Sequence, residues 1–202
     1  MEQHFSYRKE GNDYVFYRDE ELIHLCDNTI ISTANELLAA DLLIALQKKE
    51  HPGDPTSLLH YHFATLLEKV DDKINTDEIS NLCYDDFLND NYLMFHQVAP
   101  MRQIIAQHFA DNLPAFLESL PVYKRMATVL FAQTCHSYML AYYLIIDVIE
   151  QENVEESKEA FLDDLLEFYG DFFDTEDEAA SFLKDITPVI NTYVRYMSYD
   201  SV

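Results

Sequence analysis

The sequence has no tryptophan and contains little glycine, proline, cysteine or positive charge. Its 202 residues include three glycines, six prolines and three cysteines. So few glycines could hardly build a loop that cradles phosphate, and the motifs GxGxxG, GxxxxGK[ST] and GxSxG do not occur. The common kinds of nucleotide-dependent enzyme are therefore excluded.

The cysteines are odd in number and far apart. Cys26, Cys83 and Cys135 each stand among apolar neighbours, which favours buried, reduced thiols over a disulfide framework. No CxxC pair exists, so a zinc ribbon is excluded. The first residues lack a basic stretch followed by an apolar one, and we therefore expect a cytoplasmic protein without a secretion signal.

Positive charge is scarce throughout the chain. Lys and Arg number 13 against 37 Asp and Glu, for a formal net charge of −24. A direct nucleic-acid groove needs clustered Lys and Arg and is not expected. Half of the net charge falls in residues 150–185, which hold fourteen acids against Lys158 and Lys184.

Apolar residues make up 49% of the chain and recur mostly at helical spacing. We predict a mainly all-α fold, a single-domain bundle of about seven to nine helices covering residues 1–202. Within residues 1–19, two aromatic-rich runs at 5–9 and 14–18 flank a turn cluster at 10–13 and predict a short β-hairpin extension.

Capping chemistry and proline predict where several helices begin or end. A small polar residue with an acid three positions later indicates a helix start at Asn75 with Glu78, Asn153 with Glu156, and Thr175 with Glu178. Proline at a first helical position predicts starts at Asp54-Pro55, Pro121 and Pro188, whereas Pro100 predicts a break near 96–100. Gly170 is expected to end a helix.

The longest predicted helix, Val122 to Gln151, is apolar on more than one side, and we place it at the centre of the bundle. Its residues 126–146 include no Asp, Glu, Lys or Arg and are long enough to cross a bilayer. However, Gln133, Thr134, His136 and Ser137 cluster at the middle, where a membrane would penalise them most. A buried central helix is therefore expected, with no membrane partner.

The acids of 150–185 alternate with apolar residues at helical spacing, which predicts amphipathic helices. The sequence leaves open whether the acids are spread around the fold or gathered on one face that would attract a cationic partner. Partner-binding candidates are the acids Glu155, Glu159, Asp163, Asp164 and Glu167, and the tyrosines Tyr193, Tyr196 and Tyr199. Tyrosine is favoured at interfaces, although a last helix packed on its own domain explains the same spacing slightly better.

A second candidate site is a polar pocket beside the helix 122–151, formed by Gln133, His136 and Tyr143. The same polar residues are better explained as the place where a neighbouring helix supplies hydrogen bonds. Among the eight histidines, only Glu21 with His24 has ExxH spacing, and HExxH is absent. We therefore predict no metal, no cofactor and no catalytic residue.

These patterns favour a non-enzymatic acidic helical protein that binds a macromolecule, such as an adaptor, an inhibitor or a dedicated chaperone. Its expected partner is a cationic protein, and imitation of nucleic-acid phosphates is one form such binding takes. A homodimer is also compatible with the sequence. The alternative is a helical enzyme or small-ligand binder that uses the pocket beside residues 122–151.

Overall fold

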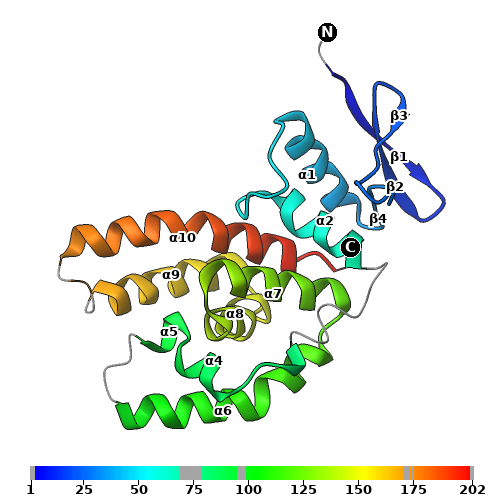
Figure 1. Cartoon of the computed structure of the whole chain (residues 1–202). Helices are drawn as coiled ribbons and strands as arrows, with labels where there is room; N and C mark the ends of the chain where they lie inside the picture. The colour runs from blue at the N-terminus through cyan, green and yellow to red at the C-terminus, as the bar shows by residue number, and fades with distance from the viewer. Residues whose placement is uncertain (1–2, 69–78, 95–98, 171–172, 174, 201–202) are drawn as a thin grey trace.

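Strands and helices occupy separate parts of the chain, in an order that confirms the mainly all-α prediction (Figure 1). The computed structural model describes residues 3–68, 79–94, 99–170, 173 and 175–200. A small antiparallel sheet lies at the N-terminal end beside α1 and α2, and the remaining helices pack below it.

The predicted N-terminal hairpin is confirmed. Strands β1 (Phe5–Glu10) and β2 (Asp13–Arg18) pair antiparallel with Phe5 opposite Arg18, and Gly11 takes the positive φ of 65° that the tight turn requires. Two strands of two residues each, β3 (Glu21–Leu22) and β4 (Ser32–Thr33), also pair with β2. They are too short to leave a period-two pattern, and the sequence did not predict them.

Helices α1 (Glu36–Gln47) and α2 (Leu58–Glu68) follow the sheet. The side chain of Asn35 caps α1 by accepting from the backbone N–H of Leu38 at 3.0 Å. The predicted helix start at Asp54-Pro55 is wrong by about one turn. Asp54 instead accepts from the backbone N–H of Thr56 in the preceding turn, and the Ser57 hydroxyl accepts from the backbone N–H of Leu59.

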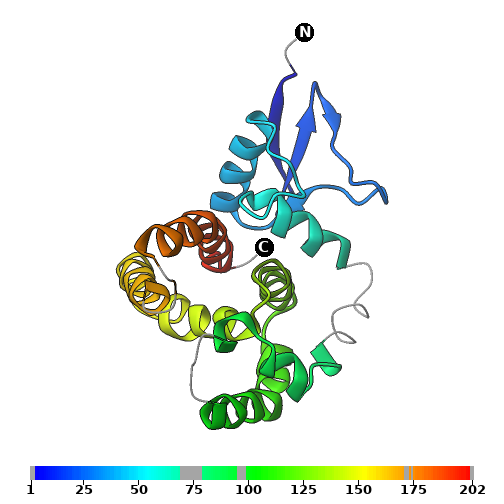
Figure 2. The same cartoon turned by 60° about the vertical axis from the view of Figure 1, so that its left-hand side comes forward.

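In the helical part of the chain, α7 contacts α2, α8 and α10, and α8 also contacts α5 and η1 (Figure 2). Two helix starts predicted from capping are confirmed, because Asn153 and Thr175 accept from the backbone N–H groups of Glu156 and Glu178. The third, Asn75 with Glu78, lies outside the described residues. The elements are α4 (Tyr84–Leu88), α5 (Asn91–Met94), α6 (Ala99–Ser119), α7 (Val122–Cys135), α8 (Tyr138–Leu144), the π-helix η1 (Ile145–Ile149), α9 (Val154–Gly170) and α10 (Glu176–Met197).

The prediction of one continuous helix from Val122 to Gln151 is wrong. The chain turns at His136, which adopts the left-handed conformation with φ 52° and ψ 39°. The Ser137 hydroxyl then caps α8 by accepting from the backbone N–H of Leu140 at 2.9 Å. The polar residues at the middle of this apolar segment therefore mark a break between two buried helices.

The prolines of the later helices behave in three ways. Pro121 precedes α7 directly, as expected. Pro188 does not begin a helix, because α10 continues through it. Its side chain is exposed, so the carbonyl left without an N–H partner lies on the solvent side of the helix. Pro100 stands in the first turn of α6, and most of the break predicted near 96–100 falls on residues 95–98, outside the described part of the chain. Helix α9 ends at Gly170, the residue expected to end it.

One hydrophobic core runs from the sheet to the last helix. It includes Phe16 of β2, Leu42 of α1, Phe131 of α7 and Tyr196 of α10, and a second cluster fills the space between α4, α6 and α8.

The cysteine prediction is partly wrong, because the side chains of Cys26 and Cys83 are exposed and Cys135 alone is half-buried. No helix within the described residues is both long and apolar enough to cross a membrane.

Candidate functional site

Helix α9 carries the predicted acids on its exposed surface. It contains six acidic residues and one lysine. Glu155, Glu159, Asp163, Asp164 and Glu167 are all exposed. The ammonium of Lys158 lies 2.6 Å from the Glu155 carboxylate, and the Lys158 side chain is only 14% exposed. The one cation on this helix is therefore already paired and largely covered by its own surroundings.

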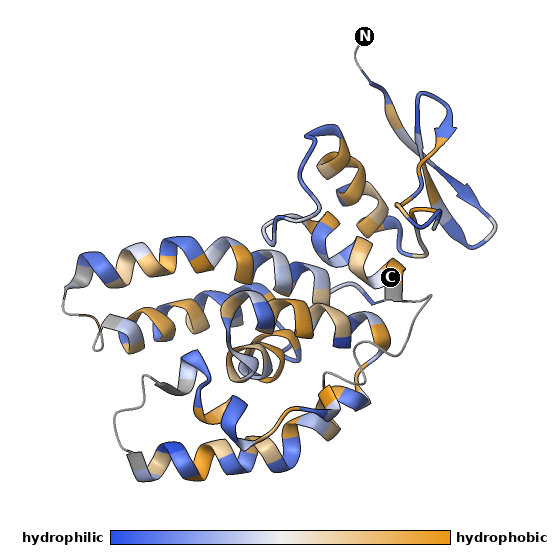
Figure 3. Cartoon of the chain, in the orientation of Figure 1, coloured by the Kyte–Doolittle hydropathy of each residue, from blue (hydrophilic) through white to orange (hydrophobic). Residues whose placement is uncertain are grey.

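Four of the six acids of α9 follow one another along the helix, whereas Asp164 lies on another side and lines a pocket with η1. Glu155, Glu159 and Asp163 follow each other at intervals of four residues, which places them in one row, with Glu167 next in the same series. Leu165 and Tyr169, on another side, are buried in the core. Like charges four residues apart oppose helix formation by a few tenths of a kcal/mol each, so packing of the buried side must hold α9 together. Figure 3 shows the resulting alternation of hydrophilic and hydrophobic residues along α9.

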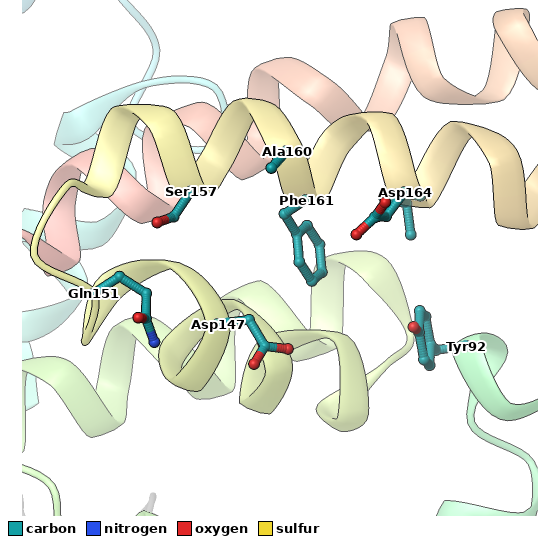
Figure 4. Close-up of a pocket in the computed structure, with 8 residues that line it drawn as sticks. Tyr92, Asp147, Gln151, Ser157, Ala160, Phe161 and Asp164 are labelled. Atoms are coloured by element: carbon teal, nitrogen blue, oxygen red, sulfur yellow. The ribbon is translucent and has the colours of Figure 1, made fainter.

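A pocket of about 470 Å³ lies beside this row, between η1, α9 and α5 (Figure 4). Asp147 from η1 and Asp164 from α9 project toward it, and Tyr92 of α5 stands at one end. None of its lining residues carries a positive charge. They are Tyr92, Asp147, Gln151, Ser157, Ala160, Phe161, Asp164 and Leu165.

The charges of Asp147 and Asp164 affect the pKa of the Tyr92 hydroxyl. Burial raises the pKa of its hydroxyl to about 12, with further contributions from Tyr143 and from the charges of Asp147 and Asp164. The two carboxylates make no hydrogen bond or ion pair with any residue in the described part of the chain. The pocket therefore presents two uncompensated negative charges next to aromatic rings.

The predicted polar pocket exists in part. Gln133 and His136 line a second pocket of about 560 Å³ with residues of α4 and the α4–α5 connection. Tyr143 is not among its lining residues, because its ring packs between Tyr92 and Phe109, with centroids 5.5 and 5.9 Å away. The chain turns at His136, so Tyr143, seven positions beyond this residue, no longer follows the helix face that Gln133 occupies.

Two carboxylates of this second pocket hold the backbone in place. Asp90 is 4% exposed and accepts from the Ser137 hydroxyl at 2.6 Å and from the backbone N–H of Met139 at 3.1 Å. Burial raises the pKa of Asp90, although these hydrogen bonds act in the opposite direction. Asp86 accepts from the backbone N–H of Cys83 at the start of α4. This pocket is therefore partly a structural junction between α4, α5 and α8.

The assignment of Tyr193, Tyr196 and Tyr199 to partner binding is wrong. Tyr193 and Tyr196 are fully buried and Tyr199 is 8% exposed. Tyr193 stacks on Phe131 with centroids 4.3 Å apart, and its hydroxyl lies 3.0 Å from the Thr128 hydroxyl. The three-residue spacing reflects the packing of α10 on its own core, which the sequence had slightly favoured.

Sequence reasoning missed Tyr92, Asp147 and Gln151 as neighbours of the acidic helix. A signal existed for Asp147, the single charge in the segment Ile145–Ile149, which is otherwise aliphatic. Within the described residues, no group of three His, Cys, Asp or Glu side chains is placed to hold a metal ion. His24, the histidine with ExxH spacing, is 3.1 Å from the carbonyl oxygen of Asn28.

Comparison with models of protein families, with curated proteins and with solved structures found no match. A function for this protein is therefore inferred from the chemistry of the sites described above.

Proposed function

We propose that this protein is a non-enzymatic binding protein that holds a cationic protein partner on α9. The surface concerned, called the acidic face below, consists of Glu155, Glu159, Asp163, Asp164 and Glu167. The observation that carries the proposal is that all five side chains are exposed on one helix whose single lysine is already paired. Such a surface attracts positive charge over distances of about 8 Å at physiological ionic strength.

The main physical effect of this acidic face is on the rate at which a cationic partner associates with the protein. Complementary charge steers partners together and raises the association rate more than it raises affinity. A second copy of this chain would bring two negative faces together, so a homodimer through α9 is disfavoured. Roles as an adaptor, an inhibitor or a dedicated chaperone in the cytoplasm, including imitation of nucleic-acid phosphates, belong to this same proposal.

The test compares two variants with equal charge. One changes the acidic face to Gln or Asn at its five positions. The control changes five exposed acids elsewhere, and these are Asp13, Glu21, Glu118, Asp185 and Asp200. Both variants raise the formal charge from −24 by five units. Exposed substitutions of this kind usually alter stability by no more than about 0.5 kcal/mol each, so both should fold.

Proteins captured from the native host by wild type are identified, and each purified partner is then tested for binding in stopped-flow kinetics. We expect the α9 variant to lower the association rate by about tenfold or more, while the control lowers it far less. We also expect the wild-type rate to fall steeply with salt. Equal rates for the two variants would refute the acidic face as the binding surface.

A second candidate function is small-ligand binding at the pocket that contains Gln133 and His136. The observation that favours it is that the structure brings these two predicted residues to one pocket with Asn81 and Asn89. His136→Gly removes the imidazole and suits the left-handed backbone there, so it should leave the fold intact. A ligand screen by thermal shift in which hits act equally on wild type and this variant would argue against the pocket.

A further inference from the structure

The pocket between η1 and α9 indicates which side chain of the partner binds beside the acidic face. We infer that it receives one arginine side chain of the bound protein, with the guanidinium between Asp147 and Asp164. This inference rests on the proposed function, because it identifies the group by which the partner is recognised. It also makes its own prediction about a small probe, which does not depend on finding the partner.

The two carboxylates come from different elements and project toward the same space (Figure 4). The side chain of Asp164 belongs to α9, whereas Asp147 stands on η1, where Ile145 and Val148 are buried and anchor the π-helical turn. A guanidinium offers five N–H donors in a planar fork and can bond to carboxylates on two sides. A lysine ammonium is a compact point charge and meets this arrangement less completely.

The other lining residues suit the rest of an arginine side chain. Tyr92 and Phe161 present aromatic rings to the pocket, and guanidinium groups stack favourably on such rings. The Tyr92 ring is itself held by stacking on Phe168, with centroids 5.2 Å apart and planes 21° apart. Ala160 and Leu165 offer apolar surface to the methylene stem.

The side-chain amide of Gln151, at the rim of the pocket, also favours a ligand that donates hydrogen bonds. The side-chain nitrogen of Gln151 donates to the carbonyl oxygen of Ile146 at 2.6 Å. This bond fixes the amide and leaves its oxygen as an acceptor, which again favours a ligand that donates hydrogen bonds. The pocket volume of about 470 Å³ is ample for one long side chain.

The test uses the whole protein labelled with ¹⁵N and three small probes. These are the Nα-acetyl methylamides of arginine, lysine and citrulline, the last being a neutral isostere of arginine. We expect arginine to cause saturable amide shifts at Asp147, Gln151 and Asp164, with a dissociation constant of about 1–10 mM. Lysine should bind more weakly and citrulline should cause no saturable shift.

Matched variants separate the pocket from the general charge of the surface. Asp147→Asn and Asp164→Asn should each weaken arginine binding about fivefold or more, and the double variant should abolish it. Glu150→Gln and Glu152→Gln remove the same charge from neighbouring exposed positions outside both the pocket lining and the acidic face. These controls should change the dissociation constant less than about twofold.

Three results with the small probes would overturn the inference and leave the proposed function standing: equal shifts with citrulline, equal weakening by the pocket and control variants, or tighter saturation of the same amides by calcium chloride. The proposed function fails by a different result, when the five-site α9 variant binds partners at the wild-type rate, and the inference then fails with it because it rests on that function. The pocket could bind the arginine probe while the α9 variant binds partners at an unchanged rate. That combination would show that the acidic face is not the partner surface. In that case the arginine would come from another source than the proposed partner, and the inference as stated would also be wrong.

Discussion

The carboxylate of Asp41 on α1 lies 2.6 Å from the guanidinium of Arg195 on α10. The same carboxylate accepts a hydrogen bond from the hydroxyl of Tyr199, which follows α10. One side chain of the N-terminal part of the chain is thus bonded twice to its C-terminal end. These bonds add a polar connection to the contacts that α2 makes with α7 and α10.

Alkaline unfolding of this protein should begin at a lower pH than its net charge alone would predict. Burial raises the pKa of Tyr199 to about 12, with the hydrogen bond to Asp41 acting in the same direction, and burial also raises the pKa of Tyr92 to about 12. Since the unfolded value is about 10, the native state keeps these protons longer, and stability is lost as pH rises from 10 through 12.

The measurement is the urea midpoint at several pH values between about 8 and 11.5, combined with tyrosinate absorbance of the folded protein. The burial of Tyr61, Tyr193 and Tyr196 raises their pKa values as well, so several of the tyrosines should ionise only with unfolding. Smooth titration of all fourteen tyrosines near their ordinary pKa, with a constant midpoint, would contradict this expectation.

Replacement of Asp90 should weaken the junction of α5 and α8. Asp90→Ala leaves the buried Ser137 hydroxyl and the backbone N–H of Met139 without their acceptor, at a cost of about 2–4 kcal/mol in unfolding free energy. Asp85→Ala, at an exposed acid on α4, is the control and should cost far less. Chemical denaturation of the three proteins measures both values, and similar losses would refute the role given to Asp90.

Acid pH should change the comparison between wild type and Asp90→Asn in a defined direction. Because burial raises the folded pKa of Asp90 above its ordinary value of 3.8, the native state takes up this proton first as the pH falls. The stability of wild type relative to Asp90→Asn should therefore increase from pH 7 toward pH 4 and become constant at lower pH. A relative stability that decreases on acidification would show that hydrogen bonding outweighs burial at this carboxylate.

Salt should stabilise the native state at pH 7. A chain with a net charge of −24 repels itself, and ions screen that repulsion. We expect the melting temperature to rise when sodium chloride is increased from about 20 to 300 mM. A constant or falling melting temperature would mean that attraction between paired charges outweighs repulsion.

Replacement of Pro188 should stabilise α10. Alanine restores a backbone N–H in the helix interior and removes the steric conflict of the ring, so Pro188→Ala should add about 1–3 kcal/mol to the unfolding free energy. Pro55→Ala, outside any helix, is the control and should not stabilise. Thermal and urea unfolding provide the comparison, and a destabilised Pro188→Ala variant would contradict the expectation.

Local chemistry predicted the parts of this fold that depend on a few neighbouring residues. The hairpin around Gly11 and the caps at Asn153 and Thr175 are of this kind, as are the exposed acids of α9. The break at His136 was not predicted, because it depends on Asp90 and Asn91, which are more than forty residues away and bond to Ser137 and to the carbonyl oxygen of His136. The pocket beside α9 was missed for the same reason, since Tyr92 and Asp147 meet Asp164 only through tertiary packing.

The break at His136 also predicts the order in which hydrogen bonds form during folding. In its own bonds the backbone N–H of Leu140 donates to the Ser137 hydroxyl, and the backbone N–H of Ser137 donates to the carbonyl oxygen of Ala132. Both bonds join residues within one or two turns of each other. The bonds from Asp90 close a loop of 47 residues and cost more chain entropy, so they are expected to form late. Loss of the Asp90 carboxylate would then appear mainly as faster unfolding, with the refolding rate almost unchanged.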